Sequence, residues 1–146
     1  MAQPFTIAID PVHPLIRVRL TGFWGTDTVD RYGEALLDTV KRQGARSARP
    51  FIILIDARTF PVQSLEVRER FSDLSANWPP IGSGPLRELV IIANSTLSRD
   101  MLDKALGGAA RIWIDPAQAM SWIDRHLAAG GLSPADAQPN RDGSTA

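Results

Sequence analysis

The chain has 146 residues, a length that suits a single domain with a core of its own. Sixteen basic residues balance sixteen acidic ones, so no overall charge would draw the protein to nucleic acid or to an anionic membrane. The absence of cysteine excludes disulfides, thiolate metal sites and cysteine nucleophiles. The first residues do not resemble a signal peptide and no apolar run is long enough to span a membrane, so we expect a cytoplasmic protein.

The N-terminal part of the chain predicts a β-hairpin followed by a long helix. Apolar and polar residues alternate over 5–9 and again over 15–20, with prolines and an aspartate between the two runs. Apolar residues then recur at helical spacing over 26–43. Thr26 suits the N-cap of this helix, and Gly44 suits its end.

Strands and helices alternate in the rest of the chain. Residues 50–56 form an almost purely aliphatic run that closes on an aspartate, which indicates a strand covered on at least one face. Ser64 can cap a helix that extends to Trp78. The later elements are predicted as a strand over 86–93, a short helix before Gly107-Gly108, a strand over 109–114 and a helix over 116–128 whose N-cap is Asp115.

The order β-β-α-β-α-β-α-β-α predicts an α/β fold with a mixed, mostly parallel sheet of five strands. We expect a single domain over 1–130 and a disordered polar tail over 131–146. The flanking strands are apolar on one side only, which favours a sheet with helices mainly on one face.

The other face of this sheet is the candidate interface. Arg17, Arg19, Arg111 and Trp113 would point to it, next to an apolar patch from the two central strands. Such a patch marks an interface with a regulatory protein or a second copy of the chain, unless loops or a terminal segment cover it.

The exit from the 50–56 strand is the candidate binding site, because ligands of α/β domains gather beyond the carboxyl ends of strands. Asp56 and Arg58 could bind a polar ligand there, although the favoured alternative is that the two side chains pair with each other or cap a neighbouring loop. His13 and His126 have no metal-ligand spacing, and His126 suits a cation at the end of a helix. We therefore expect no metal, no cofactor and no catalytic residue.

The arrangement resembles the STAS domain of anti-sigma-factor antagonists and the related Sec14-like lipid-binding fold, among them small bacterial proteins. The resemblance covers about residues 5 to 128. It rests on the hairpin that ends in 20–24, on the strand that ends Leu54-Ile55-Asp56-Ala57-Arg58, and on the segment 112–119 that leads into Trp122-Ile123.

In the antagonists, a serine at the start of the second long helix is phosphorylated by a partner kinase. The resemblance would place this serine at Ser64, but the serine-glycine pair of the family is missing here, and an N-cap role explains Ser64 without phosphorylation. The resulting candidate ligand- or partner-binding residues are Asp56, Arg58, Thr59, Ser64 and Glu66.

Three functions remain open from the sequence. The resemblance implies a non-catalytic regulatory or protein-interaction module. The Sec14-like kinship implies a carrier of a lipid or other small apolar molecule, which requires an apolar cavity under the helices, gated by the 79–85 loop. An enzyme that uses Asp56 is the least favoured of the three.

Overall fold

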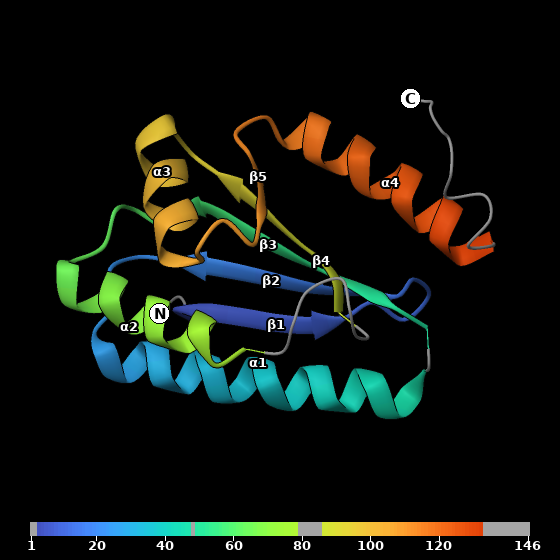
Figure 1. Cartoon of the computed structure of the whole chain (residues 1–146), viewed down its shortest axis with the longest axis horizontal. Coiled ribbons are helices and arrows are strands. Elements are labelled where there is room, and N and C mark those ends of the chain that lie inside the picture. The colour runs from blue at the N-terminus through green and yellow to red at the C-terminus, as the bar shows by residue number, and fades with distance from the viewer. Residues whose placement is uncertain (1–2, 48, 79–85, 133–146) are drawn as a thin grey trace.

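The computed structural model describes residues 3–47, 49–78 and 86–132. Within these ranges, five strands form one sheet in the order β1-β2-β3-β4-β5, flanked by four helices (Figure 1). The strands are β1 (Phe5–Ile9), β2 (Leu15–Thr21), β3 (Phe51–Thr59), β4 (Leu86–Ala93) and β5 (Arg111–Trp113). β1 and β2 pair antiparallel, and all other pairs are parallel. The predicted fold class, α/β with a mixed, mostly parallel sheet of five strands, is confirmed.

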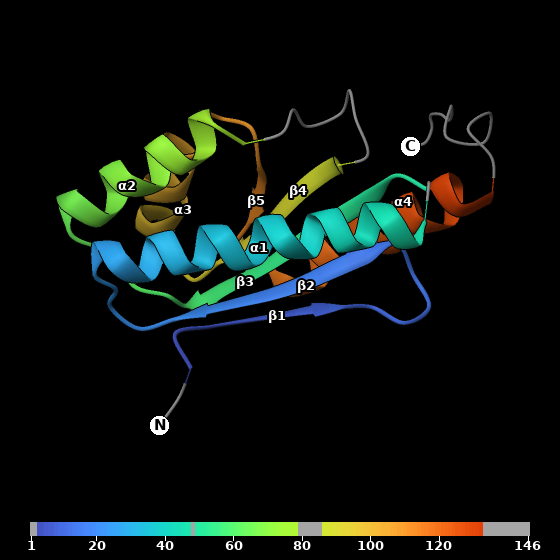
Figure 2. The same ribbon diagram turned by 90° about the horizontal axis from the view of Figure 1, so that it is seen from below.

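Three helices lie on one face of the sheet, which we call the first face. They are α1 (Thr26–Arg46), α2 (Leu65–Ala76) and α3 (Thr96–Ala105), and Figure 2 shows α1 and α2 on the same side of the strands. Each of these helices connects two neighbouring parallel strands, and the strand order advances in one direction. Because such crossovers are right-handed, all three helices must fall on the same face.

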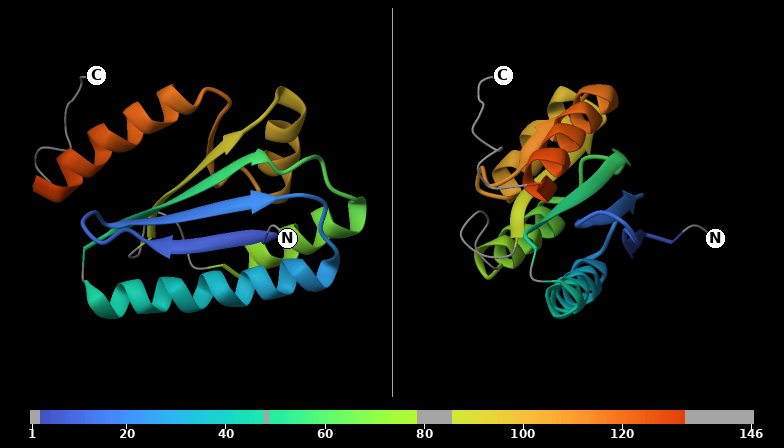
Figure 3. Two further views of the ribbon diagram at one scale, coloured as in Figure 1. Left: turned by 180° about the vertical axis from the view of Figure 1, so that it is seen from behind. Right: turned by 90° about the vertical axis from the view of Figure 1, so that its right-hand side faces the viewer.

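The fourth helix, α4 (Pro116–Leu132), lies on the opposite, second face, as the end-on view of Figure 3 shows. It follows the last strand and connects to no further one, so the crossover rule does not constrain it. Of the two alternatives for the apolar patch of the central strands, cover by a terminal segment is the one found, because α4 packs on it. The residues that form this second core are Leu15, Ile52, Leu54, Val90, Ile92, Ala119, Trp122 and Ile123.

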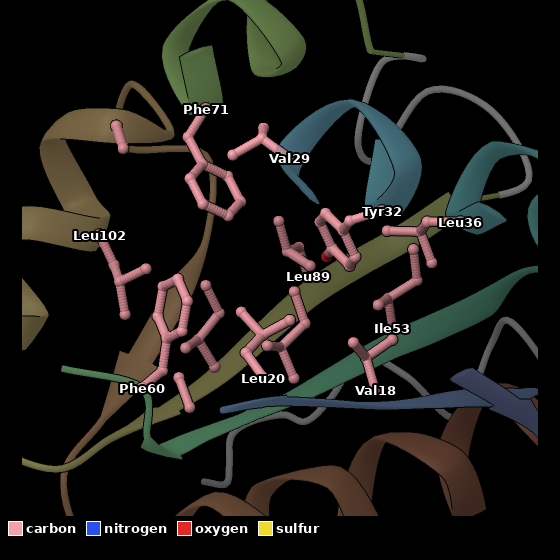
Figure 4. Packing of buried hydrophobic residues seen from close by; sticks show 14 of the residues in the cluster. Val18, Leu20, Val29, Tyr32, Leu36, Ile53, Phe60, Phe71, Leu89 and Leu102 are labelled. Carbon is pink, nitrogen blue, oxygen red and sulfur yellow. The ribbon is translucent and has the colours of Figure 1, made fainter. Parts of the chain in front are cut away.

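The larger core fills the space between the first face and α1, α2 and α3. Figure 4 shows part of it, with strand residues such as Leu20 and Ile53 below and helix residues such as Tyr32 and Phe71 above. Five aromatic rings meet at one end of this core, and the centroids of neighbouring rings are 5.1 to 6.0 Å apart. They belong to Phe5, Trp24, Tyr32, Phe60 and Phe71.

Several predicted element ends need correction. Gly25, not Thr26, is the N-cap of α1, and its carbonyl accepts hydrogen bonds from Thr28 and Val29. α1 also runs through Gly44 to Arg46, because Gly44 stays in the helix and does not adopt the left-handed conformation of a helix stop. α4 reaches Leu132, so residues 131–132 are helical, while the remainder of the predicted tail and the 79–85 loop lie outside the described residues.

Candidate functional site

Asp56 and Arg58 lie within β3 and not beyond its end, which corrects the predicted strand boundary. β3 continues to Thr59 because Thr21 of β2 extends the pairing and Gly22 donates a hydrogen bond to the Thr59 carbonyl. Asp56 lies opposite Arg19 in the register, on the second face of the sheet. The candidate site is thus on an uncovered part of this face.

The two side chains form a two-point ion pair. Arg58 donates from Nε to Asp56 Oδ1 (3.0 Å) and from Nη2 to Asp56 Oδ2 (2.8 Å), and the Arg58 backbone amide donates to the same carboxylate. Arg19 Nε lies 4.0 Å from Asp56 Oδ2. The hydrogen bonds from Arg58 hold the pKa of Asp56 below its usual range. Of the two alternatives for this pair, mutual pairing is the arrangement found.

The other predicted residues of this group lie apart from the pair. Thr59 Oγ1 donates a long hydrogen bond to the Leu20 carbonyl (3.4 Å). Ser64 is the N-cap of α2, since its Oγ accepts a hydrogen bond from the Val67 amide (3.2 Å). Glu66 is exposed in the first turn of α2, where a negative charge suits the helix dipole. Phosphorylation of Ser64 stays a prediction.

The four predicted interface residues are not one surface. Arg17 and Arg19 are exposed on β2, and Arg17 Nε lies 3.5 Å from Asp10 Oδ2. On β5, Arg111 pairs with Glu88 and lies over the Trp122 ring, whereas Trp113 is half-buried against Trp122. β3 and β4 separate the two pairs of residues.

His126 is not a helix-terminal cation, because α4 continues beyond it. Its ring stacks on Trp122 with centroids 3.6 Å apart, and its Nδ1 lies 2.9 Å from the Trp122 carbonyl. Burial lowers the pKa of His126, so the neutral ring is favoured. His13 lies in the β1–β2 turn, where its backbone amide donates to Asp10.

Gln63 is a buried polar residue that sequence reasoning missed. Its Oε1 accepts a hydrogen bond from the Trp24 amide (2.8 Å), and its Nε2 donates to the carbonyls of Gly22 (3.0 Å) and Pro61 (2.7 Å). It therefore ties the β2–α1 loop to the β3–α2 loop at the carboxyl ends of the strands. A lone glutamine ahead of a helix carries no sequence signal for such a role.

A second candidate site is an apolar cavity of about 350 Å³ between the first face and α1, α2 and α3. Its floor is formed by buried strand residues, among them Leu20, Ile53 and Leu89. No charged residue is among those that line it in the described part of the chain. The described lining residues are Leu20, Tyr32, Leu36, Ile53, Ile55, Phe71, Leu74, Ser75, Trp78, Leu89, Ile91, Leu102, Ala105, Leu106 and Ala109.

The cavity opens between the carboxyl-terminal ends of α2 and α3. The lining residues that keep some solvent exposure come from this region: Leu74, Ser75, Trp78, Leu106 and Ala109. All the strand residues of the lining are buried. The cavity is thus closed by the sheet and reached from the helical side.

In the described ranges, no group of three or more histidine, cysteine, aspartate or glutamate residues is placed to hold a metal ion. Within the same ranges, no helix has the length and apolarity needed to cross a membrane.

No protein-family model matches the chain, and no curated protein matches it significantly. Among solved structures, the chain is similar to an uncharacterised protein of the DUF3478 family with a SpoIIAA-like fold from Shewanella loihica PV-4. The two share 15% sequence identity, and the match covers 84% of this chain and 98% of that chain with a TM-score of 0.53. At this identity the likeness shows the fold alone. The SpoIIAA-like fold is the fold of STAS domains and anti-sigma-factor antagonists, so the predicted resemblance is confirmed at the level of fold.

Proposed function

We propose that this protein is a non-catalytic STAS-like module that binds a small, largely apolar molecule in the cavity beneath α1, α2 and α3. The observation that carries this proposal is the cavity itself. Its volume of about 350 Å³ falls in the range of ~300–1,000 Å³ typical of small-molecule sites. The sequence raised an apolar cavity under the helices as the requirement for a Sec14-like carrier, and the cavity described above fits that requirement.

The site at Asp56 supports a ligand function less well. The carboxylate already accepts three hydrogen bonds from Arg58, so a polar ligand would have to displace a formed ion pair. The apolar cavity, by contrast, has no such cost, because an apolar ligand replaces only water or empty space there.

Native mass spectrometry and calorimetric titration with butylbenzene test the proposal. We expect either a co-purifying small molecule or saturable binding of butylbenzene. Ala105→Leu adds apolar volume to the wall of the cavity, since Ala105 lines it from α3, and should weaken butylbenzene binding at least several-fold. Ala117→Leu is the matched control, because Ala117 is an exposed alanine on α4 and lies outside this cavity. Equal binding by both variants and the wild type would contradict the proposal.

A second candidate function, docking of a protein partner, is favoured by exposed apolar side chains at the carboxyl edge of the sheet. Phe23 follows β2, Leu65 begins α2 after β3, and Leu97 is the second residue of α3 after β4. Their exposed fractions are 79%, 59% and 68%. Because the strands that precede them are parallel neighbours, the three side chains share one edge of the sheet, and exposed apolar groups of this kind mark interaction sites.

The oligomeric state in solution tests docking of a second copy at this edge. If the edge binds another copy, the triple variant Phe23→Ser, Leu65→Ser, Leu97→Ser should have a lower mass by light scattering than the wild type at equal concentration. Val12→Ser is the control, because Val12 is equally exposed but lies in the β1–β2 turn. A monomeric wild type would leave only a different protein as the partner of this edge.

A further inference from the structure

The hydroxyl of Tyr32 is a polar group placed in an apolar cavity. Tyr32 belongs to α1, is only 3% exposed and lines the cavity of the proposed function. In the described part of the chain, no hydrogen bond to its hydroxyl is found. Figure 4 shows the side chain projecting from α1, with its oxygen directed toward Leu89 and the sheet.

The ring of Tyr32 is held in place by its aromatic neighbours. Its centroid lies 5.4 Å from that of Trp24, 5.6 Å from that of Phe5 and 6.0 Å from that of Phe71. Gly33, the next residue of α1, lies so close to Leu74 of α2 that a Cβ there would come within 2.7 Å of it. Since these aromatic neighbours surround the ring, the hydroxyl cannot easily turn away from the cavity.

A hydroxyl that faces an apolar cavity costs free energy unless a hydrogen-bond partner meets it there, and an acceptor oxygen on a bound ligand would be such a partner. Phenylalanine would fill the same place in the core without that cost. Burial also raises the pKa of Tyr32, so the group remains a protonated hydrogen-bond donor at neutral pH. The other hydroxyl of the described lining, that of Ser75, is half-buried at the mouth of the cavity.

We propose that Tyr32 is the polar anchor of the cavity and donates a hydrogen bond to a neutral oxygen acceptor, such as a carbonyl, on an otherwise apolar ligand. This inference rests on the proposed function and specifies its ligand class. The acceptor is neutral because no charged residue is among the described lining residues to balance a carboxylate. The ligand class is therefore a small ketone, aldehyde or ester, and not a free acid bound by its charge.

Two ligands of nearly equal size distinguish the contribution of the Tyr32 hydroxyl to binding from that of the apolar cavity. Butylbenzene is apolar throughout, and butyrophenone carries a carbonyl in place of one methylene group. Calorimetric titration of both ligands into the wild type and into Tyr32→Phe gives four dissociation constants. For each ligand, Tyr32→Phe changes the dissociation constant by some factor. The informative quantity is this factor for the ketone divided by the factor for the hydrocarbon.

We expect Tyr32→Phe to weaken butyrophenone binding by roughly threefold to tenfold, the effect of one net hydrogen bond. Binding of butylbenzene should stay the same or tighten, because butylbenzene has no acceptor for the hydroxyl and loses nothing when the hydroxyl is removed. Equal changes for the two ligands would overturn the anchor while leaving the apolar-ligand function in place. If neither ligand bound to the wild type, the proposed function would fall and the anchor with it.

The thermal stability of the unliganded variant provides a separate readout. If the Tyr32 hydroxyl had a structural hydrogen bond within the protein, Tyr32→Phe would lower the melting temperature. The anchor role predicts an unchanged or higher melting temperature, since the variant loses no internal bond. A clear decrease would overturn the proposal, even if ketone binding also weakened.

Discussion

At the scale of single residues, the Asp56–Arg58 pair shows what a sequence pattern can and cannot convey. An aliphatic run that closes on Asp-x-Arg predicts that the two charges lie near the end of a strand, and they do. The pattern does not convey that β3 continues to Thr59, because this depends on pairing with Thr21 across the sheet. As a result, both side chains lie on a face of the sheet and satisfy each other.

The ion pair predicts a pH-dependent contribution to stability. Hydrogen bonds from Arg58 lower the pKa of Asp56 in the folded state below the ordinary aspartate value of 3.8. Near this pH the unfolded chain therefore binds more protons than the folded one. The stabilising contribution is fully present above about pH 3.8 and is lost as the pH falls through the lower pKa of the folded state.

Asp56→Asn should consequently be destabilised by about 1 kcal/mol at pH 7 in urea unfolding. The difference from the wild type should shrink at a pH well below 3.8. Asp38→Asn is the matched control, since Asp38 pairs with Arg42 on the open surface of α1 and should have a smaller effect at pH 7. A difference for Asp56→Asn that is the same at both pH values would contradict the linkage.

At the scale of elements, the connection between neighbouring parallel strands explains why the sequence predicts so much of the fold. Each crossover has a fixed hand, so a strand order that advances in one direction places α1, α2 and α3 on one face. The sequence pointed to this arrangement through flanking strands that are apolar on one side only. The ends of elements depend on single bonds and were less predictable. Gly44, for example, is a helix stop by pattern but a helical residue in fact.

The close contact between α1 and α2 at Gly33 predicts a second effect on stability. A side chain at Gly33 would collide with Leu74, which lines the cavity. Gly33→Leu should force the helices apart or push Leu74 into the cavity, and we expect a loss of about 1–3 kcal/mol in the free energy of unfolding. The same variant should weaken butylbenzene binding.

Gly44→Ala is the control for this prediction on the same helix. Nothing lies within 4 Å of a Cβ built at Gly44, so the alanine should only improve helix propensity and raise stability by up to about 1 kcal/mol. If Gly33→Leu were as stable as Gly44→Ala, α1 and α2 would not be in the tight contact described here.

At the scale of the whole molecule, the sheet needs cover on both faces in its middle and on one face at its β1–β2 side. The sequence contains this information in part. Arg17 and Arg19 predict an open face on β2, and both are exposed. The apolar second-face residues of β3 and β4 required a covering element, but their pattern did not say whether it was a partner, a loop or a helix of the same chain.

The sequence could not predict whether a cavity exists or how large it is. It predicted only that a lipid carrier would require an apolar cavity under the helices. Apolar periodicity identifies which face of a helix or strand is turned to the core. Whether the facing side chains meet or leave a space depends on how closely the helices approach the sheet. That distance is a property of the assembled molecule.

The position of α4 leads to the last prediction. α4 is held to the second face by its own side chains, and Ile123 is buried against the sheet with 1% of its surface exposed. Ile123→Ala should cost about 2–5 kcal/mol of stability. Because no crossover ties α4 to the sheet, we expect the loss to appear first as detachment of the helix, which uncovers apolar residues of β3 and β4.

Concentration-dependent light scattering and binding of a hydrophobic dye measure this detachment. Ile123→Ala should bind more dye and self-associate, whereas Arg125→Ala, at an exposed position of the same helix, should behave as the wild type within about 0.5 kcal/mol. A variant that loses stability but neither binds dye nor associates would show that α4 unfolds together with the rest of the domain. In that case the second core would be part of one cooperative unit, and the central strands would never be available to a second copy of the chain.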